Sequence, residues 1–112
     1  MSLLAFIAAA SVWADLSVPP PRYDTGRYTA KIVYVTKPSR RCQQLNGAPS
    51  TGTVTIACYA PKIDTVIMPY YCNPRTYKPS TFCRALLRHE LGHARGGMHV
   101  DGVWVKGYWV KP

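Results

Sequence analysis

The pattern of apolar and polar positions along this 112-residue chain changes from strand-like to helical at about residue 80. Upstream, residues 28–36, 53–59 and 63–68 are rich in β-branched and aromatic side chains, which favour strands. Between the first two runs, Pro, Ser, Arg and Gly residues indicate a loop over residues 37–52. The three runs predict a small, mainly antiparallel sheet that precedes a helix.

The helical pattern begins after Pro79, where Ser80 or Thr81 is expected to cap a helix that runs to about Arg95. Successive helical residues are rotated by about 100°. The apolar stripe expected to face the sheet therefore consists of Cys83, Leu87, Leu91 and Ala94. His89 and His93 share a different face, with Phe82 and Leu86 below them.

The N-terminal residues 1–14 predict a secretory signal peptide. An apolar run at 3–10 is followed by Val12 and Ala14, which occupy the −3 and −1 positions of a cleavage site before Asp15. The alternative is a buried N-terminal strand or helix; the run is too short to span a bilayer, which needs about 20 apolar residues. Residues 15–112 then form one domain. Its proline-rich start, residues 15–27, is expected to be extended, either as a linker or as an arm packed on the domain.

Four cysteines fit an exported protein, because small domains in oxidising compartments commonly gain stability from disulfides. They contain no C-x-x-C pair, which argues against a zinc ribbon. Of the three possible connectivities, we favour Cys42–Cys58 with Cys72–Cys83, because both close short loops. Each bond should contribute roughly 2–4 kcal/mol.

The sequence H-E-L-G-H-A-R-G-G-M-H, from His89 to His99, carries the candidate chemistry. On a helix, residues four apart lie on one face, so His89 and His93 can present two imidazoles to one metal ion, beside Glu90. Gly96 can take the left-handed conformation that ends a helix and turns the chain. That turn is expected to bring His99 back as the third ligand.

This stretch resembles the H-E-x-x-H-x-x-G-x-x-H motif of the metzincin zinc endopeptidases. The resemblance implies a Zn²⁺-dependent peptidase with His89, His93 and His99 as metal ligands and Glu90 as the general base. It covers eleven residues. Metzincins also have a Met-turn after the third histidine, whereas the short segment that follows His99 contains no Met.

The segment after the motif offers further candidates. Lys106-Gly107 between two apolar triplets predicts a C-terminal β-hairpin, whose aromatic residues are expected to form a floor below the metal. Asp101 is a rival third ligand, or a group that orients a ligand imidazole. Tyr108 is a candidate hydrogen-bond donor to a developing oxyanion, with simple packing as the alternative.

The charge of the chain bears on its partners. Fourteen basic and five acidic residues give a formal net charge of +9, which favours anionic surfaces or polymers, including those of a cell wall. The basic residues are scattered and no nucleic-acid-binding motif accompanies them, so no specific nucleic acid is expected. We expect a secreted or periplasmic monomer without a transmembrane segment.

Two functions remain open at this point. The first is a secreted zinc metalloendopeptidase that hydrolyses peptide or protein substrates. The second is a non-catalytic, disulfide-bonded basic module that binds an anionic surface, with zinc structural or absent. The predicted fold class is α+β: a small antiparallel sheet, one long active-site helix and a C-terminal hairpin, held by two disulfides.

Overall fold

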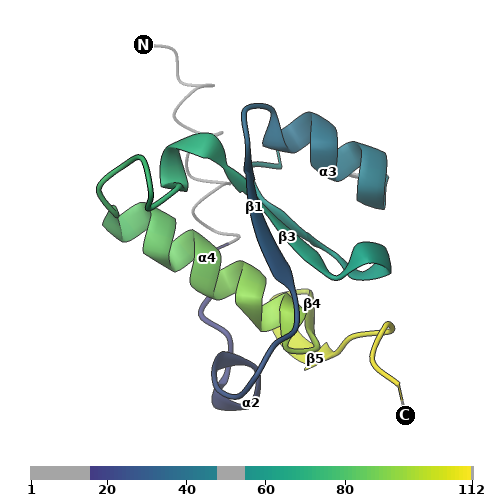
Figure 1. Ribbon diagram of the computed structural model, residues 1–112. Helices are drawn as coiled ribbons and strands as arrows, with labels where there is room; N and C mark the ends of the chain where they lie inside the picture. Colours follow the sequence, from purple (N-terminus) through teal and green to yellow (C-terminus); the bar gives the residue numbers. More distant parts are fainter. Residues whose placement is uncertain (1–15, 48–54, 112) are drawn as a thin grey trace, which may run out of the picture.

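Three strands form the centre of the fold, in the order β1 (Lys31–Val35), β3 (Thr65–Pro69) and β2 (Cys58–Ala60) (Figure 1). The computed structural model describes residues 16–47 and 55–111. The predicted signal peptide therefore lies outside the described residues, as does the start of the second predicted strand. β1 falls within the first predicted run, whereas β2 and β3 each end one residue beyond theirs.

The strand pairing is mixed, so the prediction of an antiparallel sheet was wrong for one pair. β2 runs antiparallel to β3, with Cys58 opposite Ile67, but β1 runs parallel to β3, with Val33 opposite Ile67. Parallel strands need a long crossover connection. Here that connection contains the helix α3 (Pro38–Asn46), where the sequence had indicated a loop.

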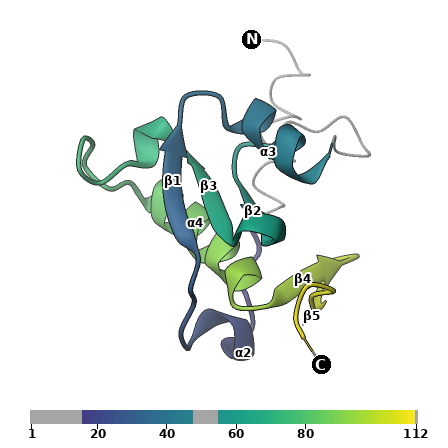
Figure 2. The same cartoon turned by 45° about the vertical axis from the view of Figure 1, so that its right-hand side comes forward.

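The two faces of the sheet are covered by different helices, α3 and α4 (Thr81–Ala94) (Figure 2). Because side chains alternate along a strand, Val66 and Met68 of β3 pack with Leu86 of α4, whereas Ile67 packs with Cys42 of α3. All of β3 is buried. Burying a side chain such as Ile67 contributes about 1.5–3 kcal/mol, so this central strand anchors both layers.

The helix α3 has end signals that match its observed bounds. Pro38 occupies its first turn, where a missing N–H costs nothing. Gly47 follows its last residue with φ +86° and donates its N–H to the carbonyl of Gln43, at 2.8 Å. The hydrophobic residues of α3 that pack against the sheet are Cys42 and Leu45, and this short apolar pattern explains why the helix was missed.

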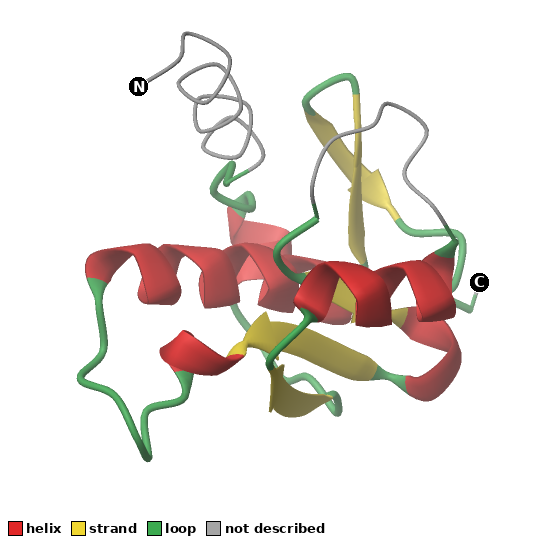
Figure 3. Cartoon of the chain, turned by 90° about the horizontal axis from the view of Figure 1, so that it is seen from above, coloured by secondary structure: helices red, strands yellow, loops and turns green. Residues whose placement is uncertain are grey.

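The helix α4 begins and ends where the sequence predicted (Figure 3). The Ser80 hydroxyl accepts the N–H of Cys83 at 2.9 Å, as an N-cap does. Of the predicted apolar stripe, Cys83 is buried, while Leu87, Leu91 and Ala94 are half-buried against the core. The deepest face is rotated from that stripe and consists of Cys83, Leu86, His89, Glu90 and Gly92.

The C-terminal hairpin exists, but its turn was predicted at the wrong place. Strands β4 (Gly97–Val100) and β5 (Val103–Lys106) are joined by Asp101 and Gly102, whose φ angles are +51° and +79°. Asp-Gly with two positive φ angles is typical of a tight hairpin. The observed hairpin therefore starts inside the histidine motif, and His99 lies on its first strand.

The N-terminal segment is an arm packed on the domain. It contains a one-turn helix, α2 (Pro21–Asp24), where the sequence predicted extended chain. Pro21 occupies the first helical position of this turn. After the turn, the Thr25 hydroxyl donates to the Pro21 carbonyl at 2.8 Å. The sequence left open whether this segment is a linker or an arm packed on the domain, and the structure shows the packed arm.

Two disulfides join the layers, with the predicted connectivity. Cys42–Cys58 connects α3 to β2, and Cys72–Cys83 connects the 3₁₀ turn η2 (Tyr70–Cys72) to the first turn of α4. The α+β class and both disulfides are therefore confirmed. Within the described residues, no helix is both long and apolar enough to cross a membrane.

Candidate metal centre

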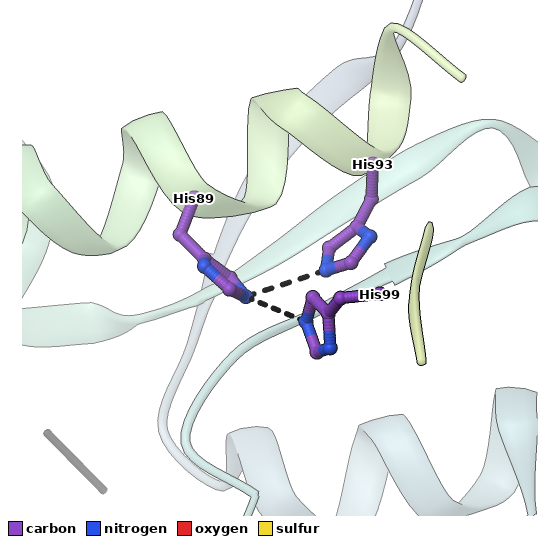
Figure 4. Close-up of side chains that lie close together, drawn as sticks. All are labelled: His89, His93 and His99. Atoms are coloured by element: carbon purple, nitrogen blue, oxygen red, sulfur yellow. Dashed lines mark hydrogen bonds between the residues drawn. The ribbon is translucent and has the colours of Figure 1, made fainter. Parts of the chain in front are cut away.

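The last two turns of α4 and the first strand of the hairpin meet at the histidine motif. The helix ends at Ala94. Two residues later, Gly96 has φ +103° and donates its N–H to the His93 carbonyl at 2.9 Å. The chain then reverses into β4. The turn predicted at Gly96 is thus present, and it places His99 opposite His89 and His93 (Figure 4).

The three imidazoles converge through their Nε2 atoms. The Nε2 of His89 lies 3.3 Å from that of His93 and 3.2 Å from that of His99 (Figure 4). The Nδ1 atoms of His89 and His93 each lie 2.8 Å from a backbone carbonyl, of Ser17 and Gly97 respectively. A carbonyl oxygen only accepts, so in the neutral rings Nδ1 carries the proton and the Nε2 lone pairs of these two rings point into the group.

This arrangement has the donor set of a metal site. Two neutral imidazole nitrogens that both carry lone pairs cannot hydrogen-bond to each other, whereas a cation between them would satisfy both. Neutral imidazole is also the commonest protein ligand of metals. His89, His93 and His99 could therefore hold a metal ion together.

Burial favours the neutral form that a ligand requires. Desolvation is the main cause that lowers the pKa of His93 to about 4, and the nearby His89 and His99 lower it further. The hydrogen bond to the Gly97 carbonyl acts in the opposite direction and is outweighed. At neutral pH the His93 ring is therefore uncharged in the metal-free protein.

Trp104 forms an aromatic floor beneath the group. It is paired with His99 across the hairpin, is only 7% exposed, and its ring centroid lies 5.0–5.4 Å from those of all three histidines. Two glycines make room for it. A Cβ on Gly97 would lie 2.8 Å from the indole, and one on Gly92 would lie 3.0 Å from it. Trp104 of the hairpin therefore packs against all three histidine rings.

Glu90 is 6% exposed and lines the same cavity as the three histidines. The cavity has a volume of about 420 Å³, and Glu90 is the only acidic side chain among the described residues that line it. Much of the remaining wall is apolar. It is formed by Leu16, Ile56, Ala57, Leu86, Met98 and Trp109.

Of the other two predicted site residues, Tyr108 lies at the cavity and Asp101 lies outside the histidine group. Tyr108 lines the cavity and is 81% exposed, so its hydroxyl is accessible from solvent. Asp101 lies in the exposed hairpin turn and is not part of the three-histidine group. Of the two rival third ligands, His99 is the one that the fold brings to His89 and His93.

Sequence reasoning missed Ser17. Its carbonyl faces His89, and its hydroxyl accepts the indole N–H of Trp104 at 3.1 Å. No local pattern in the arm identifies it, because both partners lie more than 70 residues away along the chain.

Comparison with models of known protein families, with curated proteins and with solved structures finds no match for this chain.

Proposed function

We propose that this protein is a zinc-dependent metalloendopeptidase that resembles the metzincins in its H-E-x-x-H-x-x-G-x-x-H motif. The observation that carries the proposal is the convergence of three imidazole Nε2 atoms, from His89, His93 and His99, beside the buried Glu90. Burying carboxylates and imidazoles costs stability because these groups must be desolvated, and a function at this site would explain why the cluster is kept.

The spacing of the nitrogen donors fits zinc. Tetrahedral zinc with bonds of about 2.0–2.1 Å to imidazole separates its ligand nitrogens by about 3.3–3.4 Å. The His89–His93 and His89–His99 separations, 3.3 and 3.2 Å, match that value. Three protein ligands leave one tetrahedral position open, which is typical of catalytic rather than structural zinc.

We assign the proton transfers of the reaction to Glu90. A zinc ion held by the three histidines would supply Lewis-acid chemistry, which lowers the pKa of water toward about 7 and polarises a carbonyl group. Glu90 accepts a proton from the attacking water and passes it to the amine as the peptide C–N bond breaks. Tyr108, exposed beside the same cavity, is the candidate donor to the developing oxyanion.

The cavity supports a peptide substrate with an apolar side chain. Its walls are largely apolar, and β2, which contributes Cys58 and Tyr59 to them, is an edge strand of the sheet. An extended peptide can add to such an edge through backbone hydrogen bonds. The two disulfides are compatible with an extracellular location. We therefore infer that substrate and enzyme meet outside the cytoplasm, in secreted or periplasmic form, where the basic surface would favour anionic polymers.

A matched pair of variants tests this function. Glu90→Gln preserves side-chain size and should retain one zinc per chain while peptide hydrolysis falls at least 100-fold. His93→Ala should lose both. Zinc content by elemental analysis and cleavage of a peptide library would be measured on the oxidised protein. A folded, oxidised protein that refuses added zinc would refute the proposal and favour the non-catalytic basic module.

A further inference from the structure

The N-terminal arm, residues 16–27, crosses the C-terminal half of α4 (Figure 1). Its residue Ser17 contacts His89 there. Leu16 packs against the main core and lines the cavity. Pro19 is buried against the helix so closely that a Cβ on Gly92 would lie 2.6 Å from its ring. The absence of a side chain at Gly92 is therefore what allows the arm to approach α4.

Further contacts fix the arm along the helix. Asp24 of α2 accepts two hydrogen bonds from the Arg88 guanidinium. Beyond α2, Arg95 donates to the Gly26 carbonyl at 3.1 Å. On the other side, the Arg22 guanidinium donates to the carbonyl of Trp104 at 3.2 Å. The arm is thus attached both to α4 and to the hairpin, the two elements that carry the histidines.

Ser17 connects the arm to the metal centre itself. Its carbonyl accepts from Nδ1 of His89 at 2.8 Å, and its hydroxyl accepts from Nε1 of Trp104 at 3.1 Å. One residue therefore orients a ligand ring and the floor beneath it. The matching partner of His93, the Gly97 carbonyl, lies only four residues away, so the His93 ring is oriented locally whereas His89 depends on a distant segment.

We propose that Ser17 is a positioning residue for the metal centre, and that docking of the N-terminal arm sets its metal affinity. This inference rests on the proposed zinc function. With Ser17 in place, the proton of the His89 ring is held on Nδ1 and its Nε2 lone pair faces the other ligands. Without it, the ring can rotate or take the other tautomer, whose protonated Nε2 cannot bind a metal.

The arm and the metal are then thermodynamically linked. A ligand that binds only the form with the arm docked must stabilise that form, and docking must raise the affinity by the same factor. Trimming the arm N-terminal to Pro19 would consequently weaken the centre without touching a ligand.

Three variants of the full chain test the inference. Ser17→Ala removes the acceptor of Trp104, and Pro19→Gly removes the ring that holds the arm against Gly92. Val18→Ala is the matched control, because Val18 lies between them with its side chain 60% exposed. Zinc affinity would be measured by competition with a chromophoric chelator, at a temperature where circular dichroism finds every protein folded.

Loss of such an orienting partner typically weakens metal binding 10–100-fold. Pro19→Gly frees the arm that holds the Ser17 carbonyl on His89, so we expect a loss of at least about tenfold in zinc affinity for this variant. Ser17→Ala keeps that carbonyl and removes only the hydroxyl that accepts from Trp104, so we expect a smaller loss for it, and none for Val18→Ala. Nitrogen NMR of the metal-free proteins gives a second readout. The His89 proton should be on Nδ1 in the unaltered chain and distributed over both nitrogens in Pro19→Gly.

The outcomes separate this inference from the proposed function. If the unaltered chain binds zinc and all three variants bind it equally well, the inference about the arm is overturned and the metal centre stands. If the unaltered chain binds no zinc, the metal centre is refuted. The NMR measurement then decides the role of Ser17 alone: identical His89 tautomers in the unaltered chain and in Pro19→Gly would overturn it.

Discussion

Gly92→Ala tests the packing beside the candidate metal centre, because two opposing effects of known size act at this position. In a helix interior, Ala is favoured over Gly by about 1 kcal/mol. The added Cβ would lie 2.6 Å from the Pro19 ring and 3.0 Å from Trp104. Overpacking of this kind costs about 1–3 kcal/mol. We therefore expect Gly92→Ala to lower the free energy of unfolding by about 1 kcal/mol, against the helix propensity.

Urea denaturation of the oxidised protein measures this effect, and a double-mutant cycle assigns its cause. Combining Gly92→Ala with Pro19→Gly removes the nearest contact of the new methyl group. The two changes should then be non-additive by about 1 kcal/mol, as expected for residues in contact. A Gly92→Ala protein that is more stable than the unaltered chain by the full propensity difference would refute the packing of the arm on α4.

Three other predictions follow from particular contacts. Replacing Cys72 and Cys83 together by Ser should lower the free energy of unfolding by about 3 kcal/mol. This value is the chain entropy that the unfolded state regains when a disulfide across 11 residues is removed. A loss below about 1 kcal/mol in urea denaturation would contradict the prediction. Asp101→Asn should leave zinc affinity unchanged, because Asp101 lies in the hairpin turn outside the histidine group; a chelator-competition measurement that finds a large loss would restore Asp101 as a ligand. The hydrogen bonds from Arg88 hold the pKa of Asp24 below its usual 3.8. This pair therefore stabilises the fold above that pH and loses its contribution as the pH falls below it. The difference in thermal midpoint between the unaltered chain and Asp24→Asn should shrink over that range, and a constant difference would show that the pair does not titrate as described.

Features written locally in the sequence were predictable. The bounds of α4 follow from Ser80 at one end and Gly96 at the other, and both residues act as expected. The disulfides follow from loop length, because each pair is separated by 16 residues or fewer. The convergence of His89, His93 and His99 follows from one helical turn plus one reversal of the chain.

Features that depend on distant partners were not predictable in the same way. Whether β1 runs parallel or antiparallel to β3 depends on the crossover through α3, whose apolar pattern is too short to stand out. Asp-Gly at the hairpin turn is a strong local signal. The prediction instead chose Lys106-Gly107, because an apolar triplet lies on each side of it. The Ser17 carbonyl belongs to the backbone, so the residue type at that position carries no information about its contact with His89.

The deepest face of α4 explains why a chain of this size can build such a centre. Cys83, Leu86 and Glu90 follow one another along that face, and they serve respectively as disulfide, core and candidate general base. Leu86, which packs α4 on the sheet, also lines the cavity beside the histidines. Stability and function cannot be separated along this stripe. Enlarging the cavity through Leu86 should cost core packing, whereas a change at Ser17 or Pro19 acts on His89 or Gly92 through the arm and replaces no residue of the sheet. These two arm positions are consequently the places where the histidine group can be altered while the sheet and α4 keep their own residues.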